Sequence, residues 1–360
     1  MNKRIRIKDI AERAGVSTGT VDRVLHKRGN VSQKAREKVL AVMKELDYEP
    51  NIIASTLAYN RTWRIDSLLP DYEADIYWQQ PKLGMEKALQ AVQHYGVINR
   101  SYYFDIFDTT SFKQAVAQIL ADPPEAILFA PIFLEESLNL LKACAERNIP
   151  VAMINTDIRD IKSLCYVGQD SYQSGVLGGK LLDFGLNEGE AAMILNLGKE
   201  TSNAKHMINK EQGFRDYFTQ NTDKQIEIVK SEFEDFDQEQ ELRQYIMSQL
   251  SAYPHIRGIF VINSRAYKLI NCMEEAALKK IKIVGFDLIP PNLEYLQQNR
   301  ISFLINQNPV QQGYRGIMNI VSHLLFKKEV DPIQYLPLDI IVNENVEYYL
   351  KQELQFDLVI

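Results

Sequence analysis

Carboxylate and carboxamide side chains follow the ends of several short apolar runs in the amino-acid sequence. These positions are Asp157, Gln169, Asp170, Asn263, Asp287 and Gln307. Such groups form hydrogen bonds readily, which suits them to the hydroxyl groups of a small molecule. Each one alone is equally well explained as a polar cap where a strand ends. Together they predict a pocket for a hydroxylated ligand.

Two aromatic residues, Tyr77 and Trp78, follow the first of these apolar runs. An aromatic face can stack on the apolar C–H face of a sugar ring, and the alternative is ordinary packing beneath a loop. In a catalytic alternative, Asp157, Asp170 and Asp287 act as general acid and base around a sugar. Hydrogen bonding is the simpler explanation, since none of these apolar runs is followed by a GxSxG, P-loop or GxGxxG motif.

Short apolar runs alternate with amphipathic stretches from Arg64 onward. The runs are 65–69, 102–107, 126–133, 150–155, 164–168, 191–197, 226–231, 258–263, 281–286 and 301–306. The amphipathic stretches are 81–95, 112–121, 135–147, 171–184, 239–250, 265–278 and 310–326. Buried strands alternating with helices predict an α/β fold of parallel sheets with helices on both faces. Ten strands exceed one comfortable sheet, so we expect two doubly wound lobes with crossings near residues 168, 290 and 330 and a ligand cleft between them.

The N-terminal part of the chain has a different pattern, that of two short helices joined by a sharp turn. Residues 9–14 have the apolar spacing of a buried helical stripe, and Gly15 supplies the small residue that a turn needs. Ser17 can cap a second helix with its hydroxyl group. This is helix-turn-helix geometry, in which the second helix enters the major groove of DNA.

The N-terminal residues of that second helix are the candidate base readers, namely Thr18, Gly19 and Arg23. Two ordinary surface helices are the alternative, but Ser32 can cap a third helix whose apolar side closes a three-helix core. Residues 1–64 contain 14 Lys and Arg against 7 Asp and Glu, whereas the remainder contains 27 against 40. A basic module on an acidic body suits binding to DNA phosphates through counterion release.

The segment IKDIAERAGVSTGTVDRVLHKRGNVSQKAREKVLAVMKELDYEPNIIASTLA resembles the DNA-binding domain and hinge of the lactose-repressor (LacI/GalR) family of bacterial transcription regulators. The shared blocks are DIA, AGVS, TV-x-RVL, VS-x-x-x-R-x-KV and Y-x-PN. Asp22 departs from the common Ser; its carboxylate either trims affinity for the DNA backbone or pairs with a nearby basic side chain. The DNA contacts expected from the helices and from the resemblance are Lys8, Ser17, Thr18, Gly19, Thr20, Arg23, Asn30, Ser32, Asn51, Ala54 and Leu57.

Residues 51–58, NIIASTLA, follow Pro50 and correspond to the hinge helix of the resembled family. A segment this short is not a stable helix alone, because nucleation is costly below about 12 residues. In the family the hinge forms when two copies pair over the operator, and the AxxLA pattern places the inserted leucine at Leu57. Such a wedge unstacks a base step and kinks the DNA. The alternative is a linker whose leucine packs on the next domain.

The remainder resembles the ribose-receptor-like sugar-binding domain that the same regulators contain, with VGQDSYQSG, GIFVINS, IVGFD and INQNPVQQGYRG as its anchors. The resemblance assigns sugar contacts to Asp157, Phe236, Asn263, Asp287 and Gln307. Ile158 and Lys210 stand where Arg is common, so we expect a different sugar, with Lys210 or Asn203 as the replacement contact. The expected effector-binding residues are Tyr77, Trp78, Asp157, Gln169, Asp170, Asn203, Lys210, Phe236, Asn263, Asp287 and Gln307.

Composition restricts the class of protein further. No apolar run reaches the roughly 20 residues of a membrane span, and the N-terminal MNKRIRIKDI lacks a signal-peptide core, so we expect a cytoplasmic protein. Cys144, Cys165 and Cys272 have no CxxC spacing, which favours reduced and mostly buried thiols. The His residues form no HxxxH or HExxH pair, and we expect neither a metal nor a cofactor.

These observations predict a homodimeric transcription regulator, not an enzyme, that represses carbohydrate uptake or catabolism genes from a palindromic operator and responds to a small sugar or sugar derivative. Two copies are needed because one helix-turn-helix contacts only a half-site. Residues 81–95 and 100–117 are the expected dimer surface, and the tail 343–360 lacks the leucine heptads of a tetramerising coiled coil. Two alternatives remain open: a non-sugar effector such as a nucleoside or purine, and a structural DNA-binding protein with a vestigial pocket.

The expected domains follow from these patterns. Residues 1–50 form the helix-turn-helix domain, 51–61 the hinge helix and linker, and 62–360 the bilobal effector-binding and dimerisation domain. Within the last, we expect an N-lobe of about 62–168 and 292–328 and a C-lobe of about 169–291 and 329–360. The sequence does not decide whether the effector releases DNA or tightens its binding.

Overall fold

The computed structural model describes residues 6–25, 29, 31–46, 48, 62–158, 161–198 and 205–354. The chain divides into two compact units, 1–61 and 62–360. The predicted hinge helix, residues 51–58, lies outside the described residues.

The described part of the first unit contains three helices. They are α1 (Ile7–Ala14), α2 (Thr18–Leu25) and α3 (Gln33–Glu45). Their apolar faces meet in one core of Ile10, Ala11, Ala14, Val21, Val24, Val39 and Val42. Gly15 ends α1 with a left-handed backbone (φ +65°), which glycine adopts without steric cost. The hydroxyl groups of Ser17 and Ser32 accept hydrogen bonds from the backbone N–H groups of Thr20 and Ala35. Both serines therefore cap the starts of helices, as predicted.

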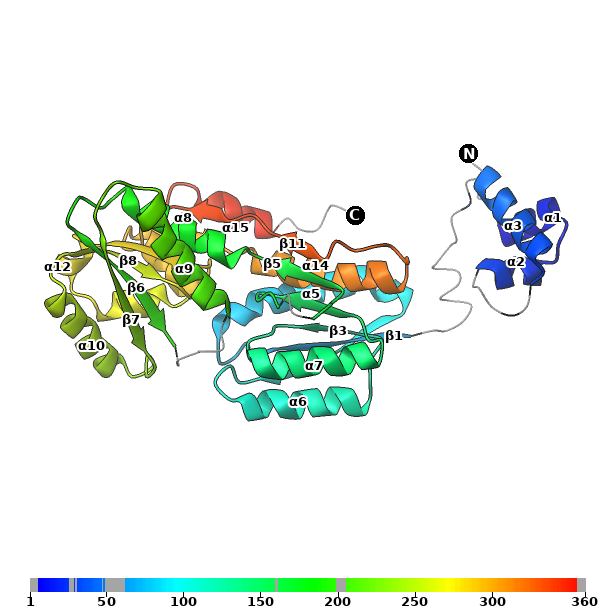
Figure 1. Ribbon diagram of the computed structural model, residues 1–360, viewed down its shortest axis with the longest axis horizontal. Coiled ribbons are helices and arrows are strands. Elements are labelled where there is room, and N and C mark those ends of the chain that lie inside the picture. The colour runs from blue at the N-terminus through cyan, green and yellow to red at the C-terminus, as the bar shows by residue number, and fades with distance from the viewer. Residues whose placement is uncertain are drawn as a thin grey trace. The chain divides into compact units, whose positions relative to one another are not determined.

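The second unit contains two six-stranded sheets (Figure 1). The first has the order β11-β5-β4-β3-β1-β2, and all its neighbouring strands are parallel. Its strands are β1 (Trp63–Pro70), β2 (Val97–Phe104), β3 (Ala126–Phe129), β4 (Val151–Ile154), β5 (Cys165–Gly168) and β11 (Ile333–Tyr335). The second has the order β12-β10-β9-β8-β6-β7 and is parallel except between β10 and β12. Its strands are β6 (Ala191–Leu197), β7 (Glu227–Phe233), β8 (Ile256–Val261), β9 (Lys282–Phe286), β10 (Phe303–Asn306) and β12 (Asp339–Ile341).

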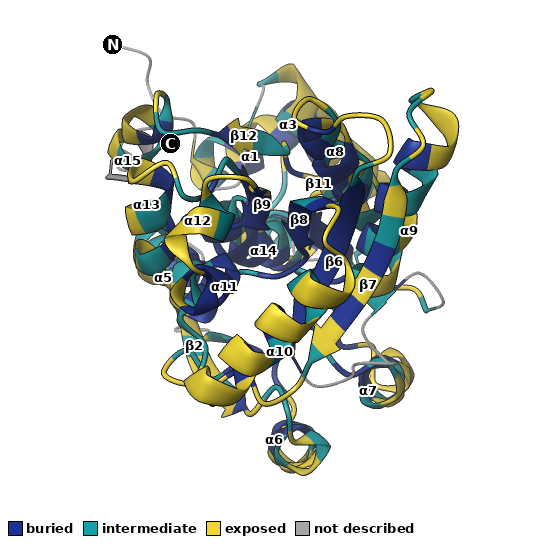
Figure 2. Cartoon of the chain, turned by 90° about the vertical axis from the view of Figure 1, so that its left-hand side faces the viewer, coloured by how far each residue is buried: buried dark blue, intermediate teal, exposed yellow. Residues whose placement is uncertain are grey.

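Helices cover both faces of each sheet, which confirms the predicted doubly wound α/β class. The first lobe has η1 (Ile76–Trp78), α5 (Gln79–Val92), η2 (Gln93–Tyr95), α6 (Thr109–Ala121), α7 (Leu134–Glu146) and α14 (Pro309–Leu324). The second has α8 (Ser171–Asp183), α9 (Lys205–Gln220), α10 (Glu239–Ala252), α11 (Ala266–Cys272), α12 (Glu275–Leu278), α13 (Pro290–Gln297) and α15 (Val346–Leu354). In Figure 1, α6 and α7 lie side by side on one face of the first sheet, with α5 and α14 on the other. Figure 2 shows the inner strands β6 and β8 buried, while α10 presents an exposed outer face.

The predicted boundaries of the two lobes are wrong in two parts. Strand β10 pairs with β9 (Phe303 opposite Val284), so residues up to Asn306 belong to the second lobe and the middle crossing falls at Gln307 rather than near residue 290. The last crossing falls between β11 and β12, because β11 pairs with β5 of the first sheet. An apolar run shows that a strand is buried, but its composition does not specify the sheet that it joins.

Candidate functional site

The outer face of α2 is the candidate DNA interface. Ser17, Thr18, Gly19 and Arg23 are exposed there, and Lys8 is exposed on α1. Beyond the neighbouring backbone of its own helix, a methyl group at Gly19 would meet only side-chain atoms within 4 Å, those of Arg23 at 3.8 Å and Ser17 at 3.9 Å. The backbone of α2 is therefore accessible at Gly19, as a close approach to a base requires.

Two of the predicted DNA contacts also have structural roles in the first unit. Thr20 is half-buried, with its Oγ1 2.9 Å from Oγ of Ser17, and Ser32 caps α3. These hydrogen bonds neither support nor oppose a contact with DNA. The predicted contacts that lie outside the described residues are Asn30, Asn51, Ala54 and Leu57.

A cavity lies between the two lobes of the second unit, beyond the carboxyl ends of their strands. Its empty volume, including the part open to solvent, is about 730 Å³. Residues of the first lobe that line it include Asp75, Tyr77, Trp78, Phe107 and Asn155. Those of the second lobe include His206, Lys210, Asn263, Ser264 and Arg265, and Gln307 lines it from the crossing between the lobes.

One wall of the cavity is aromatic. The rings of Tyr77 and Trp78 meet edge to face with centroids 5.0 Å apart, and both side chains are buried. Asp75 caps η1 by accepting a hydrogen bond of 3.1 Å from the N–H of Tyr77, and Nδ2 of Asn155 donates to the Tyr77 hydroxyl at 2.9 Å. Both predicted aromatic residues therefore line the cavity, in an orientation that their neighbours fix.

The floor is a buried chain of hydrogen-bonded polar groups. Nζ of Lys210 lies 3.4 Å from Oε1 of Gln307, whose Nε2 donates to Oδ2 of Asp287 at 2.8 Å. Asp287 accepts a second hydrogen bond from Ser264 at 2.6 Å. Lys210 also donates to the carbonyl of Ile262 and lies 3.6 Å above the centroid of an aromatic ring, that of Phe286. Burial raises the pKa of Asp287 to about 6 and lowers the pKa of Lys210 to about 8, while each charge favours the other.

Three strand ends beside the cavity turn through a left-handed backbone. Asn155 after β4, Asp287 after β9 and Asn308 after β10 have φ values of +68°, +69° and +52°. Asn and Asp tolerate this region better than other residues with a Cβ, although it still costs free energy. Such outliers gather where surrounding structure holds a functional site in place.

Asn263 lines the cavity, but its side-chain amide forms hydrogen bonds with other groups of the protein. Its Nδ2 donates to Oδ1 of Asn196 at 3.1 Å and to the carbonyl of Leu197 at 3.0 Å, and its Oδ1 accepts from the N–H of Arg265. Asn263 therefore shapes the loop that presents Arg265.

Four of the six effector residues predicted at strand ends contribute no atom to the cavity lining. Asp287 lies behind its wall and acts through Gln307 and Ser264. Asp170 caps α8 by accepting from the N–H of Gln173. In the structure both side chains have a structural role, as a helix cap or as a support, which was the alternative explanation for residues at strand ends.

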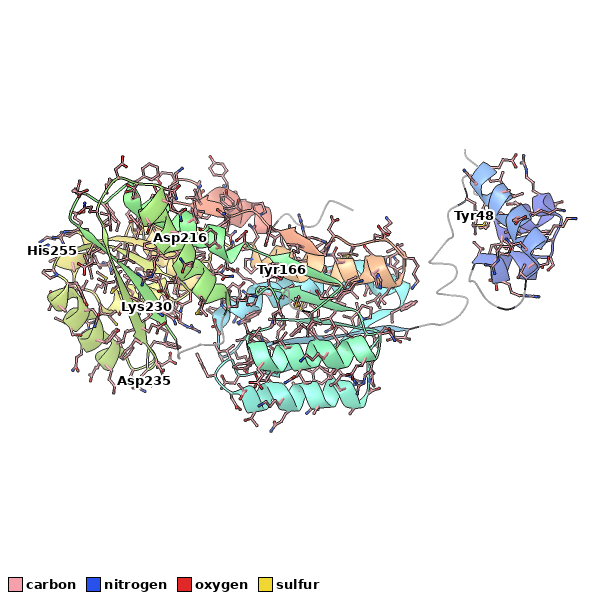
Figure 3. The ribbon with its side chains drawn as sticks, in the orientation of Figure 1. Tyr48, Tyr166, Asp216, Lys230, Asp235 and His255 are labelled. Carbon is pink, nitrogen blue, oxygen red and sulfur yellow. The ribbon has the colours of Figure 1, made fainter. Side chains whose placement is uncertain are left out.

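The other two of these residues are Asp157 and Gln169. Asp157 is half-buried and contributes no atom to the cavity. Nε2 of Gln169 donates to the carbonyl of Asn306 and so joins the ends of β5 and β10 where the chain crosses between lobes. The hydroxyl of Tyr166, labelled in Figure 3, donates to the carbonyl of Gln169 in the same region.

Phe236 also lies outside the cavity, and Asn203 lies outside the described residues. Phe236 borders a neighbouring recess together with Glu234 and Asp235, the latter labelled in Figure 3. Its ring packs 4.5 Å from the guanidinium of Arg265 and 5.9 Å from the ring of a first-lobe residue, Phe107. Phe236 thus supports the cavity from behind.

Sequence reasoning missed Asp75, Arg265 and His206. Asp75 and Arg265 form an ion pair of 2.6 Å across the two lobes, although 190 positions separate them. Nδ1 of His206 lies 3.1 Å from Oγ1 of Thr156, again across the lobes. Burial lowers the pKa of His206, and the charge of Lys210 adds to this, so its imidazole is neutral at physiological pH. No local motif marks these three residues.

Comparisons with known proteins agree with both halves of the structure. Residues 6–51 match the description "Bacterial regulatory proteins, lacI family", and residues 67–328 match "Periplasmic binding protein domain". The chain belongs to the LacI family of bacterial regulators. The resemblance found in the sequence is thereby confirmed, and the second unit of this LacI-family chain has the periplasmic-binding-protein fold.

Several curated relatives of the LacI family are similar to this chain. It is 31% identical to the HTH-type transcriptional regulator DegA of Bacillus subtilis over 58% of this chain and 59% of that protein. It is 30% identical to the catabolite control protein A of Staphylococcus epidermidis over 43% of this chain and 45% of that protein, so it spans about half the length of these two relatives. The ribose operon repressor of Halalkalibacterium halodurans is 24% identical over 95% of this chain and 97% of that protein. These homologues are regulators and not enzymes.

Solved structures show the same fold. A putative LacI transcriptional regulator from Bacteroides fragilis has a TM-score of 0.74 at 25% identity, over 80% of this chain and 100% of that chain. The glucose-galactose binding protein GanP of Geobacillus stearothermophilus has a TM-score of 0.68 at 21% identity, over 79% of this chain and 99% of that chain. Among the described residues, no helix is long and apolar enough to cross a membrane and no cluster of His, Cys, Asp and Glu could hold a metal ion. The three cysteines are buried and unpaired.

Proposed function

We propose that this LacI-family protein represses genes of carbohydrate uptake or catabolism, and that a small sugar bound between its lobes controls its affinity for a palindromic operator. The observation that supports this best is the cavity itself. An aromatic wall of Tyr77 and Trp78 accompanies a polar floor that includes Lys210 and Gln307. Aromatic faces cover the C–H surface of a sugar ring while such polar groups bond its hydroxyl groups.

The names of related proteins also support a sugar effector. One relative over nearly the whole chain is a ribose operon repressor, and another relative is a catabolite control protein. Solute-binding proteins of this fold contain α-D-tagatopyranose, D-arabinose or myo-inositol. These ligands are all small and rich in hydroxyl groups, which agrees with the chemistry of the cavity.

A homodimer in the cytoplasm is part of the proposal. A single helix-turn-helix covers a half-site, and a two-fold dimer matches a palindrome. Exposed apolar side chains are present where the dimer surface is expected, with Leu83 on α5 and Ile98 and Tyr103 on the edge strand β2. Pairing of two copies over α5 and β2 would cover them.

The test uses the full chain. Fragments selected by it from the genomic DNA of its source are footprinted, and sugars are then screened by thermal shift and by their effect on binding to the selected fragment. We expect a palindromic footprint, at least one sugar that raises the melting temperature, and a change in operator affinity with that sugar. Nucleosides and purines form a second arm, and a response confined to them would replace the sugar by a base-containing effector. Chemical turnover of a bound sugar, or a footprint without symmetry, would contradict the proposal.

A further inference from the structure

The described charged residues that line the cavity are balanced in pairs. Lys210 and Arg265 are its two cations, and Asp75 is the one carboxylate among the described lining residues. Arg265 is paired with Asp75 at 2.6 Å. Lys210 is linked to the buried carboxylate of Asp287 through Gln307. Neither cation therefore faces the cavity without a negative partner.

The guanidinium of Arg265 is held on several sides. Nη2 donates to Oδ2 of Asp75, Nη1 donates to the carbonyl of Leu197 at 3.0 Å, and the ring of Phe236 packs 4.5 Å away. Arg265 and Asp75 are only 12% and 17% exposed, so water screens their charges weakly. Because Asp75 also caps η1, its carboxylate is fixed beside the aromatic wall.

A negatively charged ligand would meet this arrangement at a disadvantage. A phosphate or carboxylate is bound well where an Arg presents two free N–H groups as a fork. Here one N–H of each Nη is already used, and the ligand would either displace Asp75 or lie near its charge. An unpaired charge in such a weakly hydrated site is costly. A neutral sugar, in contrast, can share the outer hydrogen-bonding positions of Arg265 and Asp75 through its hydroxyl groups without separating the two ions.

We propose that the effector is an uncharged sugar or polyol, and that Asp75 is the specificity-determining residue that excludes sugar phosphates and sugar acids. This inference rests on the proposed function, since it concerns the ligand of the same cavity. Asp75 excludes these anions because it is already paired with Arg265, the cation that an anionic group would require. It also places a negative charge in the cavity, which repels them.

The experiment compares matched ligands by calorimetric titration of the full chain. The neutral probes are D-glucose, D-galactose and D-ribose, each tested beside its terminal phosphate ester, and the two hexoses also beside their uronic acids. For the wild type we expect a neutral member to bind more tightly than its charged counterparts by about tenfold or more. Asp75→Asn keeps an oxygen that can cap η1 but removes the charge, so the preference should fall markedly or reverse.

Two further variants keep the outcome clear. Asp223→Asn makes the same change in charge at an exposed position after α9, and the preference should stay at its wild-type value. Asp75→Ser removes the same charge and offers a hydroxyl oxygen that can cap η1, so the preference should fall as in Asp75→Asn; this variant decides the matter if Asp75→Asn does not fold. Equal or tighter binding of a charged counterpart by the wild type, or an unchanged preference in both cavity variants, would overturn the inference while leaving a sugar effector in place. Absence of binding by every probe and by the wider sugar screen would instead remove the proposed function, and this inference with it.

Discussion

Gln307 donates a hydrogen bond of 2.8 Å from Nε2 to Oδ2 of Asp287. A carboxylate only accepts, so this bond fixes the amide and turns its oxygen toward the ammonium group of Lys210. Gln307 lines the cavity, whereas Asp287 is completely buried behind it. The carboxylate therefore positions a ligand-facing amide instead of facing the ligand itself.

Replacing Asp287 should accordingly damage effector binding from a distance. In Asp287→Ala, Gln307 and Ser264 lose their common acceptor, and we expect the affinity for the active sugar to fall by about 2 kcal/mol or more, roughly thirtyfold. Operator affinity without the sugar should remain near that of the wild type, because Asp287 lies in the second unit. Calorimetric titration of the sugar and operator binding with and without it provide the measurement. Normal binding and response would show that Asp287 is only a structural cap.

A double variant separates positioning from direct contact. If Asp287 acts through the amide, Asp287→Ala should cost little more once Gln307→Ala is present, because the group that it positions is gone. Fully additive losses would instead indicate that each residue contacts the sugar independently.

The same carboxylate should make stability depend on pH. Burial raises the pKa of Asp287 from 3.8 to about 6, so the stability that it contributes is present below pH 3.8 and is lost as the pH rises through about 6. The total is on the order of 3 kcal/mol. The unfolding free energy of the wild type, compared with Asp287→Asn, should therefore decline between about pH 4 and pH 6. Denaturant titrations across this range test it, and parallel curves for the two proteins would contradict it.

The stability that Lys210 contributes depends on pH in the opposite direction and over a separate pH range. Burial lowers its pKa from 10.5 to about 8, so its contribution is present above pH 10.5 and is lost as the pH falls through about 8. Between about pH 6 and pH 8 both groups are charged, and Gln307 connects them. The decline assigned to Asp287 is thus distinguishable from any effect of Lys210, which lies at higher pH.

Sequence patterns sufficed for the buried strands, because these are continuous apolar runs, and for a cavity at their carboxyl ends. They did not predict the short edge strands β11 and β12, most of whose residues are not buried. They also sufficed for Gln307, which directly follows such a run, and for Tyr77 and Trp78 in the loop after the first run, all of which line the cavity. For Asp170 they left two explanations open, since a polar residue between a strand and a helix can cap the helix as readily as it can face a ligand; in the structure Asp170 caps α8.

The parts of the site that sequence could not supply depend on contacts between distant segments. Asp75 and Arg265 meet only because the two lobes approach each other, and no spacing rule connects positions that far apart. Helix α9 was not predicted either, since KHMINKEQGFRDYFTQ is mostly polar and buries chiefly Lys210, Gly213 and a few aromatic residues. Lys210 and His206 owe their place in the cavity to this helix.

A glycine contact holds α9 against α8 and should be intolerant of a side chain. A Cβ at Gly175 would lie 2.0 Å from the carbonyl oxygen of Lys210. Such a clash could be relieved only if the backbone of α8 or of α9 moved. We expect Gly175→Ala to cost about 1–3 kcal/mol of stability, although Ala usually stabilises a helix relative to Gly, and to weaken sugar binding by displacing Lys210. Gly19→Ala is the matched control, because the space beside Gly19 is open and that helix should be unharmed. Thermal unfolding and sugar titration make the comparison; a Gly175→Ala protein as stable as the wild type would show that the helices separate freely.

The final prediction concerns how α2 reads DNA. Thr18 is exposed at the start of α2 and is not its cap, since the hydroxyl of Ser17 accepts the hydrogen bond from the N–H of Thr20. In a helix-turn-helix such a position faces base edges, so Thr18→Ala should cost about 1–3 kcal/mol on the selected operator and much less on random DNA. Ser17→Ala is the control, because loss of a helix cap should weaken binding to both kinds of DNA. Affinities for both are measured by mobility shift at one salt concentration, since phosphate contacts vary steeply with salt. An equal loss on operator and random DNA in Thr18→Ala would assign Thr18 to the phosphate backbone, and the reading of bases would then rest on Gly19 and Arg23.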